Sequence, residues 1–184
     1  SPGPWAFARA AEPAMAASVL VRFYRRAWDD HRGRSLSDIR AFDTERLEGT
    51  HDYIQWLFPL PEPSAASAHA PVLSREDIAT FAADPALREE LRRSLDVMLA
   101  FYGLERTGSG EAAAIARATN YAGRSREWLD RSHNFLRISR ILRCLALSVL
   151  GIGLEHFWSL PFALAGVSVL DTAGVPRLLA HNLD

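Results

Sequence analysis

Residues 84–103 read DPALREELRRSLDVMLAFYG, and this stretch is the strongest local indication of the fold. Asp84 is a good helix N-cap, and Pro85 suits the first helical position because the N–H that proline lacks would have no partner there. Large apolar side chains then recur at helical spacing, at Leu87, Leu91, Leu95 and Met98. Since Gly103 is suited to ending a helix, we expect this helix to run from residue 85 to residue 102.

On the carboxyl side, two further apolar segments predict helices. One runs from about residue 132 to residue 150, and its apolar face comprises Phe135, Ile138, Leu142, Leu145 and Val149. The other covers residues 154–170, after a glycine-containing break, and Pro161 is expected to kink it. Between residues 110 and 128, we expect an Ala-rich helix and a short helix that begins at Ser125.

On the amino side, the spacing of Val19, Phe23 and Ala27 predicts a first helix from about residue 15 to residue 29. Asp43 or Thr44 can cap a second helix that runs to residue 58, where prolines follow. Ser74 and Asp77 form a loose capping box before a short helix. No internal repeat and no alternating pattern of several strands is evident.

These segments predict an all-α fold: a single compact helical bundle, or orthogonally packed helices around a central buried helix. With 184 residues and 48% hydrophobic composition, we expect residues 1–184 to form one domain. The formal net charge of −1 gives no nucleic-acid signature. No apolar run reaches the roughly 20 residues needed to span a bilayer, so we expect no transmembrane segment and a soluble protein.

Two features of composition restrict the chemistry. All 21 residues counted as Lys+Arg are arginines, which excludes a lysine Schiff base. The single Cys144 cannot form an internal disulfide, so a reducing cytoplasmic location is the default expectation.

The first candidate site lies on the helix predicted to end at residue 58. There Glu48, His51 and Gln55 would share one side, with spacing suited to ligand contact, acid/base chemistry or half of a metal site. A hydrogen-bonded interior network is the alternative. The neighbouring aromatics Tyr53, Trp56 and Phe58 would line a ligand cavity or, alternatively, pack in the core.

The second candidate site is a polar stripe on the helix that begins near residue 132. Its members recur every three or four residues: His133, Arg137, Arg140, Cys144 and Ser148, with Asn134 at the edge. The two arginines can hold a phosphate, a diphosphate or a carboxylate through charge-assisted hydrogen bonds. An exposed stripe or a structural salt-bridge network is the alternative.

Glu155 and His156 form a third candidate, because they would lie near the amino end of a helix. The catalytic candidates are therefore Glu48, His51, Glu155 and His156. The ligand-binding candidates are His51, Gln55, Trp56, His133, Asn134, Arg137 and Arg140. If the protein is an enzyme, Glu48, His51 and Glu155 are the candidate ligands for a divalent metal such as Mg²⁺.

The block HDYIQWLFPLPEPS at residues 51–64 resembles the signature of the conserved N-terminal region of opioid growth factor receptor proteins. Other blocks fit the same pattern: RFYR at 22–25, VMLAFYGL at 97–104, SHNFLRISRIL at 132–142 and GLEH at 153–156. The resemblance covers about residues 19–165. It implies a helical domain and, for the animal receptors, recognition of an enkephalin-type peptide with growth-regulatory and nuclear roles.

The sequence lacks the long repeat-containing extension of those receptors, so we expect a short family member. Our leading hypothesis is a receptor-like ligand-binding domain whose ligand is a peptide or a small anionic or apolar molecule. An alternative is a metal-dependent prenyl diphosphate (terpene) cyclase in which Arg137 and Arg140 hold the diphosphate. A second alternative is a protein–protein interaction module that uses exposed aromatic side chains.

Overall fold

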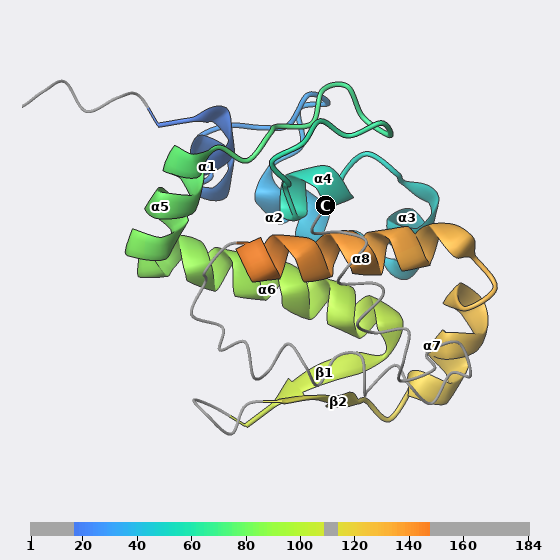
Figure 1. The fold of residues 1–184 in the computed structure, drawn as a ribbon. Helices are drawn as coiled ribbons and strands as arrows, with labels where there is room; N and C mark the ends of the chain where they lie inside the picture. The colour runs from blue at the N-terminus through green and yellow to red at the C-terminus, as the bar shows by residue number, and fades with distance from the viewer. Residues whose placement is uncertain (1–16, 109–113, 148–184) are drawn as a thin grey trace, which may run out of the picture.

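The computed structural model describes residues 17–108 and 114–147, and this part is mostly helical, as the sequence predicts (Figure 1). In chain order, the elements are α1 Val19–Tyr24, α2 Leu36–Arg40, α3 Thr44–Gly49, α4 Ile54–Leu57, α5 Arg75–Ala83, α6 Pro85–Tyr102, β1 Leu104–Thr107, β2 Ala114–Arg117, α7 Tyr121–Trp128 and α8 Ser132–Leu147. In Figure 1, α6 and α8 cross the middle of the molecule, with α1 and α5 at one end and α7 at the other.

The long helix α6 has the two ends that its sequence predicts. The Asp84 side chain accepts a hydrogen bond from the backbone N–H of Ala86 at 3.0 Å, and Pro85 occupies the first turn. At the other end, Gly103 adopts the left-handed conformation, with φ 76° and ψ 30°. The predicted apolar stripe is buried, which makes α6 a central support of the core.

The predicted capping box before α5 is also present, since Ser74 and Asp77 each bond to the other's backbone N–H. The first helix is shorter than predicted. Ser18 caps α1, and the helix ends at Tyr24 because Arg26 takes a left-handed φ of 60°.

The single helix predicted from Asp43 to residue 58 is wrong, because the chain is interrupted between Gly49 and Ile54. Thr50 has an extended backbone, with φ −99° and ψ 131°, and α4 begins four residues later. Glycine and threonine favour helix less than most residues do, which permits the break. The change of direction buries Tyr53, Ile54 and the three residues after them.

The Ala-rich helix predicted after residue 110 is also wrong, because residues 114–117 form strand β2. This strand pairs antiparallel with β1, and Leu104 lies opposite Arg117. Leu104 and Ile115 are its buried side chains, whereas residues 105–107 are exposed. Helix α7 then begins at Tyr121, earlier than the predicted start at Ser125.

Helix α8 begins where the sequence predicts, and Ile138 of its predicted apolar face is buried, but the rest of the buried face differs from the prediction. Ile138, Ile141 and Cys144 are buried, and Leu142 and Leu145 pack against the core while remaining partly exposed. Phe135, predicted to lie in the core, is 37% exposed. Val149 and the helix predicted at residues 154–170 lie outside the described residues, and within residues 17–108 and 114–147 no helix is long and apolar enough to cross a membrane.

Candidate functional site

The break between α3 and α4 directs His51 and Asp52 toward different parts of the molecule. The His51 ring faces helix α8, where its Nδ1 lies 3.3 Å from Nη2 of Arg137. Asp52 instead forms ion pairs with the loop that follows α1, where its Oδ1 accepts from Arg34 at 3.0 Å. The segment that begins with His51 is therefore attached on two sides.

Arg137 joins α8 to the end of α3. Its Nη2 donates to the carbonyl oxygens of Glu48 at 3.2 Å and Thr50 at 2.7 Å. Its Nη1 donates to Oδ1 of Asn134 at 3.2 Å, and its guanidinium lies 5.6 Å from the centre of the Tyr53 ring. Carbonyls at the end of a helix lack partners within the helix, so a guanidinium there satisfies them and complements the helix dipole.

The Glu48 carboxylate is the acceptor at the middle of this group. It receives bonds from Asn134 Nδ2 at 3.2 and 3.3 Å and lies 2.7 Å from Nε2 of His133. Arg131 Nη1 is 3.3 Å from the same carboxylate, and Arg137 Nη1 is 4.0 Å from it. We call these residues the Glu48 cluster: Glu48, His51, Arg131, His133, Asn134 and Arg137.

The cluster favours a charged Glu48 and a neutral His51. Burial alone would raise the pKa of Glu48, but the hydrogen bond from Asn134 and the charge of His133 outweigh it and lower the pKa. Partial desolvation of the His51 ring against α8 lowers the pKa of His51, and so do the positive charges of Arg137 and His133. Because arginine can only donate, Nδ1 of neutral His51 accepts from Arg137 and its proton resides on Nε2.

Only part of the Glu48 cluster is within reach of solvent. Asn134 and Arg137 are 0% and 4% exposed, so they contribute mainly to holding the helices together. His51 is exposed, and the side chains of His133 and Arg131 are 34% and 55% exposed. A ligand on the surface would therefore first meet the two imidazoles and Arg131.

Three of the other predicted ligand-binding residues do not join the cluster. Gln55 donates to the His51 carbonyl oxygen at 3.3 Å, and Trp56 packs against Phe23, with 5.1 Å between ring centres. Gln55 Oε1 and Trp56 Nε1 are buried, and neither has a hydrogen-bond partner among the described residues. Arg140 donates to the Phe58 carbonyl oxygen at 3.2 Å, and burial lowers its pKa.

The predicted metal set is only partly within the described residues, because Glu155 lies outside them, as does the catalytic candidate His156. Within residues 17–108 and 114–147, no three His, Cys, Asp or Glu side chains are placed to hold a metal ion. The combination of Glu48, His51 and Glu155 therefore stays a prediction.

Sequence reasoning missed the polar network on the Asp52 side. Asp30 is 6% exposed and accepts from Arg34 Nε at 2.6 Å, while Arg34 also reaches Asp52. His31 lies 3.4 Å from Asp52 and stacks on Trp56 at 6.3 Å. The pair Asp30 and Arg34, four residues apart, was the available signal, but no spacing connects it to Asp52.

Comparison with known proteins assigns the family. Residues 29–164 match the family model described as "Opioid growth factor receptor (OGFr) conserved region". The human opioid growth factor receptor is 44% identical over 113 residues, which is 60% of this chain and 16% of that protein. The rat receptor is 43% identical over 113 residues, again 60% of this chain and 18% of that protein.

Rat opioid growth factor receptor-like protein 1 is 37% identical over 123 residues, covering 64% of this chain and 24% of that protein. No solved structure matches. The chain thus covers less than a quarter of the length of these relatives, and it contains the region they share. The chain belongs to the opioid growth factor receptor conserved-region family.

Proposed function

We propose that this domain binds a peptide or a small anionic molecule, and that the ligand's carboxylate contacts the exposed edge of the Glu48 cluster. The observation that carries this proposal is the excess of positive charge there. Arg131 and Arg137 are permanent cations, whereas Glu48 is the carboxylate that they share. An added carboxylate would restore the balance and accept hydrogen bonds from Arg131 and His133.

The names of the relatives favour a peptide within this class of ligands. The matched human and rat proteins are named receptors for an opioid growth factor. A short peptide with a free C-terminus presents the carboxylate that the exposed Arg131 and His133 can hold. Its side chains can contact Phe135, which lies two residues after His133 on α8 and is 37% exposed.

Titration calorimetry with an enkephalin-type peptide tests this proposal. We expect the peptide with a free C-terminal carboxylate to bind about tenfold more tightly than its C-terminal amide. Arg131→Gln and His133→Gln should remove that difference. Arg143→Gln is the matched control, because Arg143 lies on the same helix and forms an ion pair with Glu62 away from the cluster.

Two results would overturn the proposal. One is a folded protein that binds neither form of the peptide nor inorganic diphosphate. The other is equal binding of the acid and the amide, because this would show that the ligand's carboxylate does not contact the cluster.

The cyclase alternative has no contact in its favour among the described residues. It requires Arg137 and Arg140 to hold one diphosphate, yet Arg137 bonds to two backbone carbonyls and Arg140 to a third. Incubation with a prenyl diphosphate and Mg²⁺, followed by product analysis, tests it directly. Formation of a cyclic product would favour the enzyme.

A further inference from the structure

A second charged surface lies at the carboxyl end of α1, away from the residues of the Glu48 cluster. Arg26 follows the helix in the left-handed conformation, at φ 60°, a position that glycine usually occupies. Its N–H donates to the Phe23 carbonyl, and the next N–H donates to the Arg22 carbonyl, as in a glycine-terminated helix. Arg26 therefore adopts a backbone conformation that is unfavourable for residues other than glycine.

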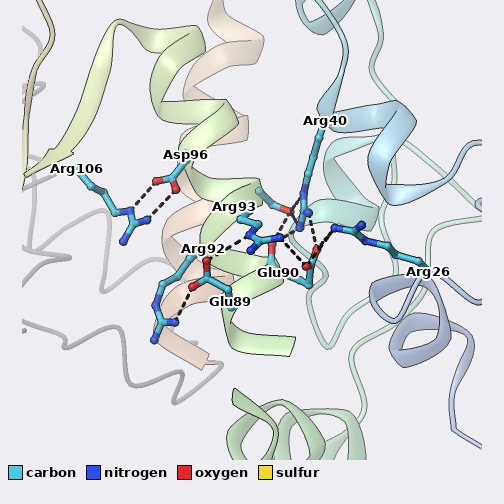
Figure 2. Close-up of polar contacts among 9 residues, drawn as sticks. Arg26, Arg40, Glu89, Glu90, Arg92, Arg93, Asp96 and Arg106 are labelled. Atoms are coloured by element: carbon cyan, nitrogen blue, oxygen red, sulfur yellow. Dashed lines mark hydrogen bonds and ion pairs between the residues drawn. The ribbon is translucent and has the colours of Figure 1, made fainter. Parts of the chain in front are cut away.

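The side chain of Arg26 reaches Glu90 on α6. Its Nη2 lies 3.2 and 3.1 Å from the two carboxylate oxygens. Arg40 and Arg93 converge on the same carboxylate, as Figure 2 shows, at 2.5 and 3.2 Å. The Arg40 side chain is only 11% exposed and also bonds to Ser94. Arg40 therefore connects α2 to α6.

Positive charge exceeds negative charge across this surface. Among the described residues, the ion pairs here join five guanidiniums to three carboxylates: Arg25, Arg26, Arg40, Arg92 and Arg93 to Asp84, Glu89 and Glu90. The side chains of Arg25, Arg26 and Arg93 are 49%, 49% and 54% exposed. Since the whole protein has a formal charge of −1, these cations are a local concentration.

An exposed aromatic ring follows Arg25 and Arg26 closely in the chain, at Trp28. Trp28 is 45% exposed, and the Arg22 guanidinium lies 4.1 Å from its ring centre. Tryptophan and arginine are the residues that most often carry the binding energy of protein interfaces. An exposed tryptophan loses unfavourable contact with water when a partner covers it, so it can anchor a bound segment.

We propose that this α1-end surface, formed by Arg22, Arg25, Arg26, Trp28 and Arg93, binds an acidic peptide segment that carries an apolar residue. The carboxylates of the segment pair with the half-exposed arginines, and the apolar residue covers Trp28. A short peptide fits better than a nucleic acid or an anionic membrane, because the near-neutral overall charge of −1 indicates no extended basic surface, and an apolar residue of a peptide can cover Trp28. This surface is separate from the Glu48 cluster, and binding here does not depend on the ligand proposed for that cluster.

Fluorescence anisotropy with a labelled peptide of Glu and Asp residues around one Leu tests the proposal. We expect it to bind more tightly than the matching Gln and Asn peptide, and more weakly as salt increases. Arg25→Gln and Arg93→Gln should each weaken binding about fivefold, and Trp28→Ala about tenfold. Arg106→Gln is the matched control, since Arg106 pairs with Asp96 farther along α6 (Figure 2).

Arg26→Gly separates binding from structural support. Glycine suits the left-handed backbone at this position, so the variant should keep or raise the thermal midpoint while binding the acidic peptide about fivefold more weakly. A lower midpoint with unchanged binding would show that Arg26 only supports the fold and would overturn its role here.

Three further results would overturn the proposal as a whole. They are equal binding of the acidic and amide peptides, equal weakening by Arg106→Gln, and binding of oligo(dT) or of phosphatidylserine vesicles as tightly as the acidic peptide. The Glu48-cluster variants Arg131→Gln and His133→Gln should leave acidic-peptide binding unchanged, so the two proposed surfaces can fail independently.

Discussion

At the residue scale, both the backbone conformation and the close neighbours of residue 103 require glycine there. Its φ of 76° is left-handed, and a Cβ there would lie 2.8 Å from the Tyr121 Cα and 3.0 Å from the Arg124 Cβ. We expect Gly103→Ala to lower the free energy of unfolding by roughly 2–4 kcal/mol, because strain and a backbone clash act together. Urea unfolding measures the loss.

Two other glycines provide controls for the two causes. Gly33 shares the left-handed φ, at 72°, but has no atom within 4 Å of its Cβ position, so Gly33→Ala should cost about 1 kcal/mol from strain alone. Gly123 lies in α7 with open space and no positive φ, so Gly123→Ala should be neutral or stabilising. Equal losses at Gly33 and Gly103 would contradict the predicted clash.

His51 gives the protein a specific sensitivity to acid. Its pKa is below the ordinary value of 6.5 in the folded protein, chiefly through partial desolvation of the ring and the charge of Arg137. The unfolded chain therefore takes up the proton first as pH falls, and stability is lost as pH decreases below about 6.5. His51→Gln, which can still accept from Arg137, should reduce the loss of stability between about pH 7 and about pH 5.

Imidazole NMR shifts of His51 across this range provide the direct measurement. A midpoint at or above the ordinary pKa of 6.5 would contradict the prediction. Glu48 adds to the acid sensitivity at lower pH: its lowered pKa stabilises the fold above about its ordinary value of 4.5, and this contribution is lost as pH falls below it.

At the element scale, Asp77 links two helices. It accepts from the N-cap backbone N–H of α5 at 3.0 Å and from the hydroxyl of Ser18, the cap of α1, at 2.5 Å. Its side chain is buried, and the single change Asp77→Ala removes hydrogen bonds at the start of α5 and at the start of α1. We expect it to reduce the free energy of unfolding by roughly 2 kcal/mol.

Asp38 is the matched comparison, because it forms the same capping box at the start of α2 but is exposed. Asp38→Ala should reduce the urea midpoint less than Asp77→Ala does. Equal reductions would show that the connection to Ser18 contributes nothing.

Helix ends that depend on adjacent residues are predictable from the sequence, whereas those that depend on residues far along the chain are not. The start of α5 and both ends of α6 depend on Ser74, Asp77, Asp84 and Gly103, which act on adjacent residues, so the sequence predicts them. The break after Gly49 uses carbonyls that bond to Arg137, far along the chain, and no local pattern shows that contact. Strand β2 forms because Ile115 is buried beside its partner strand, although alanine favours helix.

At the scale of the whole molecule, stability should be greatest along α6. Its buried leucines contact the common core, whereas the β1–β2 hairpin exposes most of its side chains. We expect amide hydrogen exchange to be slowest in the middle of α6 and several orders of magnitude faster in the hairpin. Equally slow exchange in both would show that the hairpin opens only with global unfolding.

The Glu48 cluster joins residues of α3, α8 and the segments beside them, so its assembly depends on the fold of the whole molecule. Residue chemistry identified Glu48, His51, His133, Asn134 and Arg137 as candidates, and the fold brings these five together. Helical spacing also grouped Gln55 with Glu48 and His51, but that grouping assumed a continuous helix. Trp56 instead packs against Phe23, and Arg140 bonds to the Phe58 carbonyl oxygen, and no local spacing indicates either contact.

The attachment of Arg137 to carbonyl oxygens has a consequence for sequence variation. Every amino acid carries a carbonyl, and a Cβ at Gly49 would meet no atom within 4 Å, so substitutions at residues 49 and 50 should preserve this junction. A deletion there would instead displace the carbonyls from the guanidinium. In a mutational library, this turn should therefore tolerate many amino-acid substitutions but no change in the number of its residues.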